Sequence, residues 1–332
     1  MSLEKTRAAI TAIEAYIPPY VLTNDEISEM VDTTDEWIMT RVGIRERHIL
    51  KEKGVGMSYM AERAVKSLLE KSNTVPDEIG AVICSTVTPD MIFPASASII
   101  ADKCGIENAM TFDMNVGCAG FIHAFKTAAL YVESGFCKKA IVVSSEMMSS
   151  ITDYTDRNTC PLFGDGAAAV LVEARADGTG LQDSILRSNG IGASHLYMTA
   201  GGSRFPASRE TVDKHQHYIY QDGKTVFKWA VEKMADVSAE IMERNRLSPN
   251  DVAYLLPHQA NLRIIDAVAN RMGIDKDKKV LINIDMYGNT SSATIPILMW
   301  DNQHKFKKGD NLILSSFGAG FAWGSLWVKW AI

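Results

Sequence analysis

The sequence matches itself weakly at an offset of about 170 residues, and this repeat limits the possible folds more than any other feature. The matching segments are 68–83 with 241–256 and 136–145 with 306–316. Solenoid repeats are only about 20–50 residues long, so an offset of this length indicates duplication of a whole domain. A chain of 332 residues has room for two domains of roughly 100–200 residues each.

Each half of the repeat alternates helical patterns with short, continuous apolar runs that are typical of buried strands. These runs are 81–84 and 140–144 in the first half and 254–256 and 311–315 in the second. A further strand with a Gly-rich end is expected before Cys118 and, by the repeat, before Asn289. Apolar strands between helices indicate mostly parallel sheets covered on both faces. We therefore predict two such sheets packed back to back in a duplicated five-layer α/β/α/β/α fold.

The turn-rich residues 175–180 mark the expected boundary between the two halves. The predicted domains are therefore residues 1–175 and residues 176–332. A polar segment, 200–223, separates the boundary from a helix that is expected to begin near Lys224.

Charge and cysteine content exclude several classes of protein. With 34 Lys and Arg against 40 Asp and Glu, the net charge of −6 offers no general surface for nucleic acid or an anionic membrane. No stretch approaches the roughly 18 apolar residues of a membrane-spanning helix, and the N-terminal sequence does not resemble a signal peptide. We interpret Met1-Ser2-Leu3 as a remnant of expression cloning. The five cysteines form no C-x-x-C pair, which favours reduced thiols in a cytoplasmic protein.

One cysteine is placed where it can act as a nucleophile. Cys118 lies between a strand pattern and the helical pattern 122–131, so we expect it at a helix N-terminus. Unpaired backbone N–H groups and the positive end of the helix dipole lower the pKa of a thiol there. Gly117 and Gly120 allow a sharp turn and the close approach of a substrate. The remaining cysteines, interpreted as small buried hydrophobic residues, are Cys84, Cys104, Cys137 and Cys160.

Two polar residues of the second half also follow strand patterns. His258 comes shortly after the apolar run 254–256, at the strand end where ligands gather in parallel sheets. Asn289 occupies the place in its half that Cys118 occupies in the first. The duplication therefore predicts that Cys118 and Asn289 approach each other across a pseudo-twofold axis, with His258 at the neighbouring strand end. Asn289 can also cap a helix, and the two roles are compatible.

Other kinds of catalytic site are disfavoured. The order Cys118, His258, Asn289 is also that of papain-type proteases, but the C-G-[SA]-C-[WY] signature is missing and the cysteine lies far from the N-terminus. His215 and His217 are too small a group for a metal site, and no H-E-x-x-H, P-loop or strand–G-x-G-x-x-G–helix pattern occurs. We therefore expect no metal and no nucleotide redox cofactor.

Motifs spread over nearly the whole chain resemble those of β-ketoacyl-acyl carrier protein synthase III, a family of thiolase-like condensing enzymes. They lie at 34–48, 118–121, 163–166, 257–263 and 288–292 and in the Gly-rich C-terminal strand. The resemblance implies a thiolase-like fold and a decarboxylative Claisen condensation that initiates fatty-acid biosynthesis. In it, an acyl-CoA primer (acetyl-CoA or a similar short acyl-CoA) and malonyl-acyl carrier protein give 3-oxoacyl-acyl carrier protein, CO2 and CoA. Acyl-CoA is a substrate, so no cofactor is implied.

The same resemblance assigns catalytic roles. It implies that Cys118 accepts the acyl group, while His258 and Asn289 hold the thioester carbonyl of malonyl-acyl carrier protein. The backbone N–H groups of Cys118 and Ala319 would form the oxyanion hole for acyl transfer. The family often has glycine where Ala319 stands, but a backbone donor survives this change.

Binding residues also follow from the resemblance. The side chains expected to bind CoA are Trp37, Arg41, Arg157 and Asn261, and those expected to dock the acidic carrier protein are Lys228, Arg263 and Arg271. Trp37 and Arg157 would sandwich the adenine, although Trp37 can instead anchor the helix 35–41 in the core. Solvated surface charge is an equally good interpretation of Arg271. The family is typically homodimeric, and Phe93 is expected to reach across to the acyl pocket of the other subunit.

Two alternatives belong to other classes of protein. A condensing enzyme or acyltransferase of a secondary-metabolite pathway would keep the same three catalytic residues and differ only in its pocket. A non-catalytic thiolase-like partner subunit is disfavoured because Cys118, His258 and Asn289 are all present.

Overall fold

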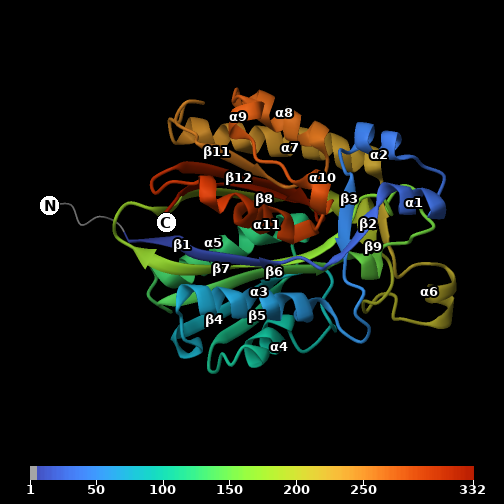
Figure 1. Ribbon diagram of the computed structural model, residues 1–332, viewed down its shortest axis with the longest axis horizontal. Coiled ribbons are helices and arrows are strands. Elements are labelled where there is room, and N and C mark those ends of the chain that lie inside the picture. The colour runs from blue at the N-terminus through green and yellow to red at the C-terminus, as the bar shows by residue number, and fades with distance from the viewer. Residues whose placement is uncertain (1–5) are drawn as a thin grey trace.

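The computed structural model describes residues 6–332, which form two β-sheets packed between three layers of helices (Figure 1). From top to bottom in Figure 1 the layers are α7 (Gly223–Arg244) with α8 (Leu262–Met272), the second sheet, α5 (Gly120–Glu133) with α11 (Thr294–Asn302), the first sheet, and α3 (Met57–Ser72) with α4 (Ser96–Lys103). The predicted five-layer fold is therefore confirmed. The cloning remnant proposed at Met1-Ser2-Leu3 lies outside the described residues.

The two sheets have the same strand order, which is the structural counterpart of the sequence repeat. The first sheet has the order β1 (Arg7–Tyr16), β7 (Asp165–Arg175), β6 (Lys139–Met147), β4 (Ile79–Ser85), β5 (Met110–Met114), and the second β8 (Gly180–Ser188), β13 (Ala322–Lys329), β12 (Asn311–Gly318), β11 (Tyr254–Pro257). In each sheet the second strand of this order is antiparallel to both neighbours, and the other strands share one direction. Strand β7 ends at Arg175 and β8 begins at Gly180, the limits of the turn-rich stretch.

The second half departs from the repeat just before Asn289. The strand expected there is not formed, and only an isolated bridge joins Val280 to Leu255. The Oε1 atom of Gln259 accepts a hydrogen bond from the backbone N–H of Asn283 (3.1 Å) and another from the residue after it. A side-chain acceptor thus replaces the backbone ladder, and the second sheet has one strand fewer than the first.

The central helices are apolar because both of their faces are covered by a sheet. Residues 294–299 of α11 are buried without interruption, and α5 buries Phe121, Ile122 and Phe125. The segment 294–299 is apolar nearly all round and needs such an enclosed position, whereas α5 keeps an outer side with Lys126 and the exposed Leu130. A single 3-10 turn comes directly before each central helix: η2 (Gly117–Ala119) before α5 and η5 (Ser291–Ala293) before α11.

The smaller elements are attached around these layers. They are β2 (Tyr20–Thr23), β3 (Glu46–Ile49), α1 (Asn24–Met30), α2 (Asp35–Arg41), β9 (Leu196–Met198), α6 (Arg209–Asp213), β10 (Ile219–Gln221), α9 (Lys276–Lys279), α10 (Ile284–Tyr287) and the 3-10 turns η1 (Pro76–Glu78), η3 (Met148–Ile151), η4 (Gly190–Ser194) and η6 (Gln303–Lys305). Figure 1 shows α1, α2, β9 and α6 together at its right-hand end. Within residues 6–332, no helix is both long and apolar enough to cross a membrane.

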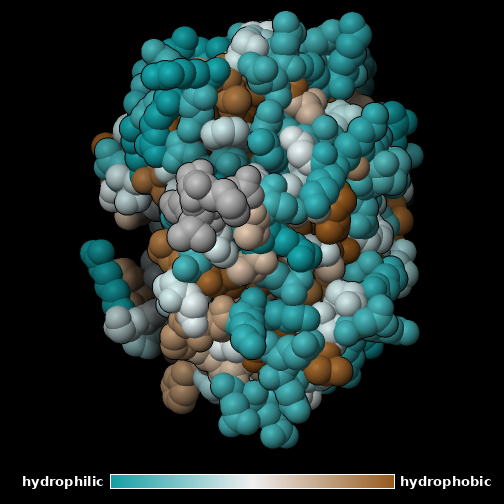
Figure 2. Space-filling view, turned by 90° about the vertical axis from the view of Figure 1, so that its left-hand side faces the viewer, coloured by the Kyte–Doolittle hydropathy of each residue, from teal (hydrophilic) through white to brown (hydrophobic). Residues whose placement is uncertain are grey.

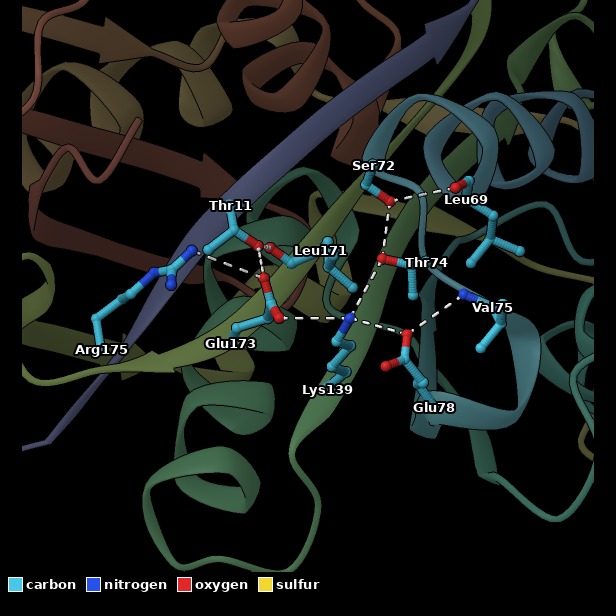
Figure 3. Close-up of polar contacts among 10 residues, drawn as sticks. All are labelled: Thr11, Leu69, Ser72, Thr74, Val75, Glu78, Lys139, Leu171, Glu173 and Arg175. Atoms are coloured by element: carbon cyan, nitrogen blue, oxygen red, sulfur yellow. Dashed lines mark hydrogen bonds and ion pairs between the residues drawn. The ribbon is translucent and has the colours of Figure 1, made fainter.

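A polar network joins the segments at the amino end of β6. Lys139 forms ion pairs with Glu78 (3.0 Å) and Glu173 (3.6 Å), and its Nζ lies 3.4 Å from the hydroxyl of Thr74 (Figure 3). The network therefore ties β6, β7 and η1 together at the ends of the strands opposite to the site described next. The left-hand end of the molecule, seen face-on in Figure 2, is mainly hydrophilic with small apolar areas.

Candidate active site

A cavity of about 1420 Å³ lies where the carboxyl ends of strands from both sheets meet. Cys118, His258 and Asn289 all line it, so the structure brings together the three residues that the repeat predicted to be neighbours. Other predicted site residues in its wall are Trp37, Arg41, Arg157, Asn261, Arg263 and Ala319. Three predicted residues lie outside the wall: Lys228, Arg271 and Phe93.

Cys118 lies in η2, directly before α5, as the sequence predicts. Its carbonyl accepts a hydrogen bond from Oγ of Ser316 (2.9 Å), which ties the turn to the end of β12. The turn and the Gly-rich C-terminal strand are in very close contact: a Cβ atom on Gly318 would lie 2.5 Å from the backbone N of Cys118. A Cβ on Gly117, whose φ is +54°, would lie 2.7 Å from the backbone N of Ala319. Only glycine allows this approach.

The pKa of Cys118 does not follow the sequence-based expectation. Burial raises the pKa of the thiol to about 12, and a hydrogen bond from the Ser291 side chain acts in the opposite direction. A helix start favours the thiolate, but the loss of water around a charged sulfur is the larger effect here. The expected lowering of this pKa is therefore wrong, and the thiol is protonated at neutral pH.

His258 is held at the end of β11 as a neutral ring. Its backbone N–H donates to the carbonyl of Ser315 (2.8 Å), and its Nδ1 atom lies 2.6 Å from Oγ1 of Thr294. The side chain is nearly inaccessible, and burial lowers its pKa to about 3. Among the described residues Nε2 has no hydrogen-bond partner, so this nitrogen is available to a substrate.

Asn289 is anchored by its backbone and oriented by its side chain. Its N–H donates to the carbonyl of Leu162 (2.9 Å), and its carbonyl accepts from the N–H of Gly164 (3.1 Å). Oδ1 accepts from the backbone N–H of Ser291 (2.9 Å), so the oxygen of the carboxamide is already used. Within the described chain Nδ2 has no acceptor, and it is the atom left to donate into the cavity.

The mouth of the cavity carries the predicted Trp37 and Arg157 pair. The guanidinium carbon of Arg157 lies 5.3 Å from the centre of the Trp37 ring. Trp37 is 37% exposed, and the buried residue of α2 is Ile38, so Trp37 is not a core anchor. Asn261 uses its carboxamide inside the protein: it caps α8 through the N–H of Arg263 and donates to the carbonyl of Arg41 (3.1 Å).

The basic residues of the second half differ in their surroundings. Lys228, Arg263 and Arg271 are all exposed. Arg263 lies over the ring of Phe227 at 4.8 Å, next to the cavity mouth. Arg271 is paired with Asp236 at 3.1 Å, away from the cavity.

Sequence reasoning missed two polar residues that contact site residues but do not line the cavity themselves. Thr294 binds the ring of His258, and Glu146 is fully buried beside the turn that follows Asn289. Glu146 carried a weak signal that could have found it, because it is a charged residue shortly after the apolar run 140–144 and within the same strand β6. Thr294 carried none, since 36 residues separate it from His258.

The chain has a duplicated thiolase-like fold. One half contributes a cysteine to the cavity, and the other half contributes a histidine and an asparagine. This combination defines a condensing enzyme. Two family models match the chain, 3-oxoacyl-[acyl-carrier-protein] synthase III at residues 112–190 and the C-terminal part of the same family at residues 242–330. The chain belongs to the β-ketoacyl-acyl carrier protein synthase III family, and it is an acyltransferase.

Relatives and solved structures agree with this membership over the full chain. β-Ketoacyl-[acyl-carrier-protein] synthase III 2 of Bacteroides thetaiotaomicron is 54% identical over 328 residues, which cover 99% of this chain and 98% of that protein. The crystal structure of 3-oxoacyl-[acyl-carrier-protein] synthase III from Aquifex aeolicus VF5 matches with a TM-score of 0.89 at 36% identity, covering 97% of this chain and 100% of that chain. The priming β-ketosynthase of the R1128 polyketide pathway matches with a TM-score of 0.90 at 31% identity, covering 100% and 98%. The predicted family, fold and part in initiating fatty-acid synthesis are confirmed.

Proposed function

We propose that this chain condenses a short acyl-CoA primer, such as acetyl-CoA, with malonyl-acyl carrier protein by way of an acyl-Cys118 intermediate. The observation that carries the proposal is the convergence of Cys118, His258 and Asn289 on one cavity from the two halves of the fold. We infer that the halves, residues 1–175 and 176–332, are the two domains of the chain and that their junction forms the site. Its five unpaired cysteines support a cytoplasmic location.

The first step is acyl transfer to Cys118. The sulfur of Cys118 bonds to the thioester carbon of acyl-CoA, the bond from that carbon to the CoA sulfur breaks, and the proton of the cysteine thiol ends on the departing CoA. Negative charge grows on the carbonyl oxygen as this happens. The backbone N–H of Ala319 has no hydrogen-bond partner among the described residues and lies beside the cysteine turn, so it can stabilise that oxygen together with the N–H of Cys118.

The second step is decarboxylation and condensation. The bond between the malonyl carbon and its carboxylate breaks, CO2 leaves, and the electron pair moves towards the thioester oxygen. Nδ2 of Asn289 and Nε2 of His258 are the free donors that would hold this oxygen, in a buried place where such bonds are strong. The carbanion then attacks the acyl-Cys118 carbonyl, and the cysteine leaves as a thiolate and takes up a proton. The product is 3-oxoacyl-acyl carrier protein.

The CoA end of the primer fits the mouth of the cavity. A base stacked between two flat groups needs about 7 Å between them, because each contact takes about 3.5 Å. Arg157 lies closer than this to Trp37, so one of the two side chains would move outward to admit adenine. Arg41 and the exposed Arg263 are near enough to the same mouth to attract phosphates. We expect Arg157→Ala to raise the KM for acyl-CoA more than it lowers kcat.

Carrier protein would dock beside the same mouth. Arg263 in the cavity wall and Lys228, which follows the wall residue Phe227, are exposed without an ion-pair partner among the described residues, and an acidic protein is attracted by such charges. Arg271 already has Asp236 as partner, which weakens its predicted role in docking. Arg263→Ala is therefore expected to raise the KM for malonyl-acyl carrier protein more than Arg271→Ala does.

The exposed edge of the first sheet fits a homodimer. Strand β5 pairs with a neighbour on one side only, and none of its five residues is fully exposed or fully buried. Apolar side chains around it are exposed, among them Ile92, Phe93 and Phe136, with Phe93 82% exposed. An open edge beside apolar residues favours pairing with a second copy. Sedimentation of the wild type and of Phe93→Asp would test this, since a dimer formed through Phe93 should dissociate in the variant.

Intact-mass spectrometry after incubation with acyl-CoAs tests the reaction itself. We expect one acyl adduct on the wild type, the same adduct on the control Cys137→Ala, and none on Cys118→Ala. His258→Ala and Asn289→Ala should still be acylated but fail to decarboxylate malonyl-acyl carrier protein. An unacylated wild type, or loss of both steps together in His258→Ala, would contradict the proposal.

The choice of primer is open to a second proposal, in which the chain also primes a secondary-metabolite pathway, favoured by the match to the R1128 priming β-ketosynthase. The two proposals use the same three catalytic residues and differ in the primer. Acylation rates with acetyl-, isobutyryl- and longer acyl-CoAs separate them. Preference for acetyl-CoA or another short primer supports the first proposal, and efficient use of an unusual primer supports the second.

A further inference from the structure

We propose that Glu146 is a positioning residue for the condensation, because its carboxyl group fixes the turn that orients Asn289. Glu146 lies near the carboxyl end of β6 in the first half, is completely buried and does not line the cavity. No step of the mechanism above uses it. The inference rests on the role proposed for Asn289.

One oxygen of Glu146 is fixed by the loop that follows β4. Its Oε2 atom accepts from the hydroxyl of Thr86 (3.1 Å), the backbone N–H of Val87 (3.0 Å) and the hydroxyl of Thr88 (3.0 Å). The two hydroxyl oxygens already accept backbone N–H groups, from Thr88 to Thr86 (3.0 Å) and from Met147 to Thr88 (2.9 Å). Their hydrogens are therefore free to point at Oε2, and the carboxyl group is held firmly within its own half.

The other oxygen of Glu146 reaches across to the second half. Its Oε1 atom lies 2.7 Å from Oγ of Ser292 and 3.4 Å from the backbone N of the same residue, in the turn η5. The hydroxyl of Ser292 is also 3.1 Å from the carbonyl of Ser85. A Cβ atom on Gly120 would lie 3.2 Å from Cβ of Ser292 and much closer to the Ser85 hydroxyl, so the contact is packed against the start of α5. Ser292 has no room to move in that direction.

This contact matters because the preceding residue has an unusual backbone. Ser291 has a φ of +51°, a conformation that residues other than glycine adopt only when their surroundings impose it. In this conformation its N–H donates to Oδ1 of Asn289, which leaves Nδ2 of Asn289 as the donor towards the cavity. Glu146, by holding Ser292, holds the residue next to Ser291. If that anchor is removed, we expect the turn to relax and the carboxamide of Asn289 to lose its orientation.

Ser292→Ala tests the inference, because it removes the link from Glu146 with little risk to folding. We expect malonyl decarboxylation to slow by at least about 10-fold, the usual effect of a lost buried hydrogen bond on a transition state, while acylation of Cys118 changes by less than about 2-fold. Thr88→Val loosens Glu146 from the other side and should slow the same step. The matched control is Ser325→Ala, a buried serine that donates to the carbonyl of Leu314 (3.1 Å) in the second sheet, and it should leave both steps unchanged.

A double-mutant cycle separates positioning from general damage. If Ser292 acts through Asn289, Ser292→Ala should cause no further slowing in the Asn289→Ala background. The inference would be overturned if Ser292→Ala slowed decarboxylation as much in the Asn289→Ala background as in the wild type. Equal slowing of acylation and decarboxylation in Ser292→Ala would overturn it too. Both results would leave the proposed function intact. A normal decarboxylation rate in Asn289→Ala would overturn the role proposed for Asn289 and this inference with it.

Discussion

The Nδ1 atom of His258 lies 2.6 Å from the hydroxyl oxygen of Thr294, the first residue of α11. The single hydrogen of this hydroxyl can go to Nδ1 or to the carbonyl of Ser291 (3.2 Å), and Nδ1 is the nearer acceptor. A hydroxyl that donates to Nδ1 leaves the ring proton on Nε2, and this tautomer can donate to a thioester oxygen. The contact thus connects the start of a central helix to the chemistry proposed for the histidine.

We expect Thr294→Val to slow decarboxylation by about 10-fold, because valine has the shape of threonine but cannot fix the tautomer. Acylation of Cys118 should be nearly unchanged. Nitrogen-15 NMR of histidine-labelled protein would show whether the tautomer of His258 shifts. Thr294→Ser keeps the hydroxyl and should behave like the wild type, and a Thr294→Val enzyme with normal decarboxylation would refute the assignment.

The buried ring of His258 should make the protein less stable in mild acid. Its pKa is about 3 in the folded state, whereas an unfolded histidine has a pKa of about 6.5, so protons bind the unfolded chain first as the pH falls. Stability is therefore lost as the pH decreases below about 6.5. Between pH 7 and pH 5 the wild type should lose about 2 kcal/mol more of its unfolding free energy than His258→Asn. Urea unfolding at the two pH values measures this, and parallel losses in both proteins would contradict it.

Gly318 should not tolerate a side chain. A Cβ there would lie 2.5 Å from the backbone N of Cys118 and 3.0 Å from that of Ala119, so alanine must displace the turn that carries Cys118. We expect Gly318→Ala to slow acylation by at least about 10-fold, since the proposed nucleophile and the proposed oxyanion hole would lose their alignment. Gly190→Ala is the control, because no atom lies within 4 Å of its added Cβ. Equal acylation rates in the two variants would show that the close approach is not needed.

The network around Lys139 should affect stability without affecting catalysis. The side chain is only 21% exposed and pairs with both Glu78 and Glu173 (Figure 3). We expect Lys139→Ala to lower the unfolding free energy by about 1 kcal/mol at most, because the half-buried Glu173 and the exposed Glu78 both lose this ion pair while Glu173 keeps Arg175. Lys66→Ala breaks a more exposed pair, with Glu62, and should cost less. Denaturant unfolding compares them, and a fall in kcat of Lys139→Ala would argue against a purely structural role.

Much of the architecture follows from local patterns. The apolar runs of β4, β6, β11 and β12 became strands at the predicted places, since a strand covered on both faces must be apolar throughout. The repeat also brought Cys118 and Asn289 to one cavity, because equivalent points of two copies meet at the axis that relates them. The missing strand before Asn289 was not predictable in this way. It is replaced by hydrogen bonds to the Gln259 side chain, a contact between segments distant in the sequence.

The sequence by itself therefore determined the duplicated fold, the position of Cys118 before a helix and the family of the enzyme. Only the tertiary structure decided the environment of each reactive group. The pKa of Cys118 is raised rather than lowered because burial depends on every layer packed around the thiol. Thr294 and Glu146 became visible as partners of the site only once segments far apart in the chain were packed together. Hydrogen bonds of this kind have no sequence period, because they depend on which surfaces the fold brings into contact.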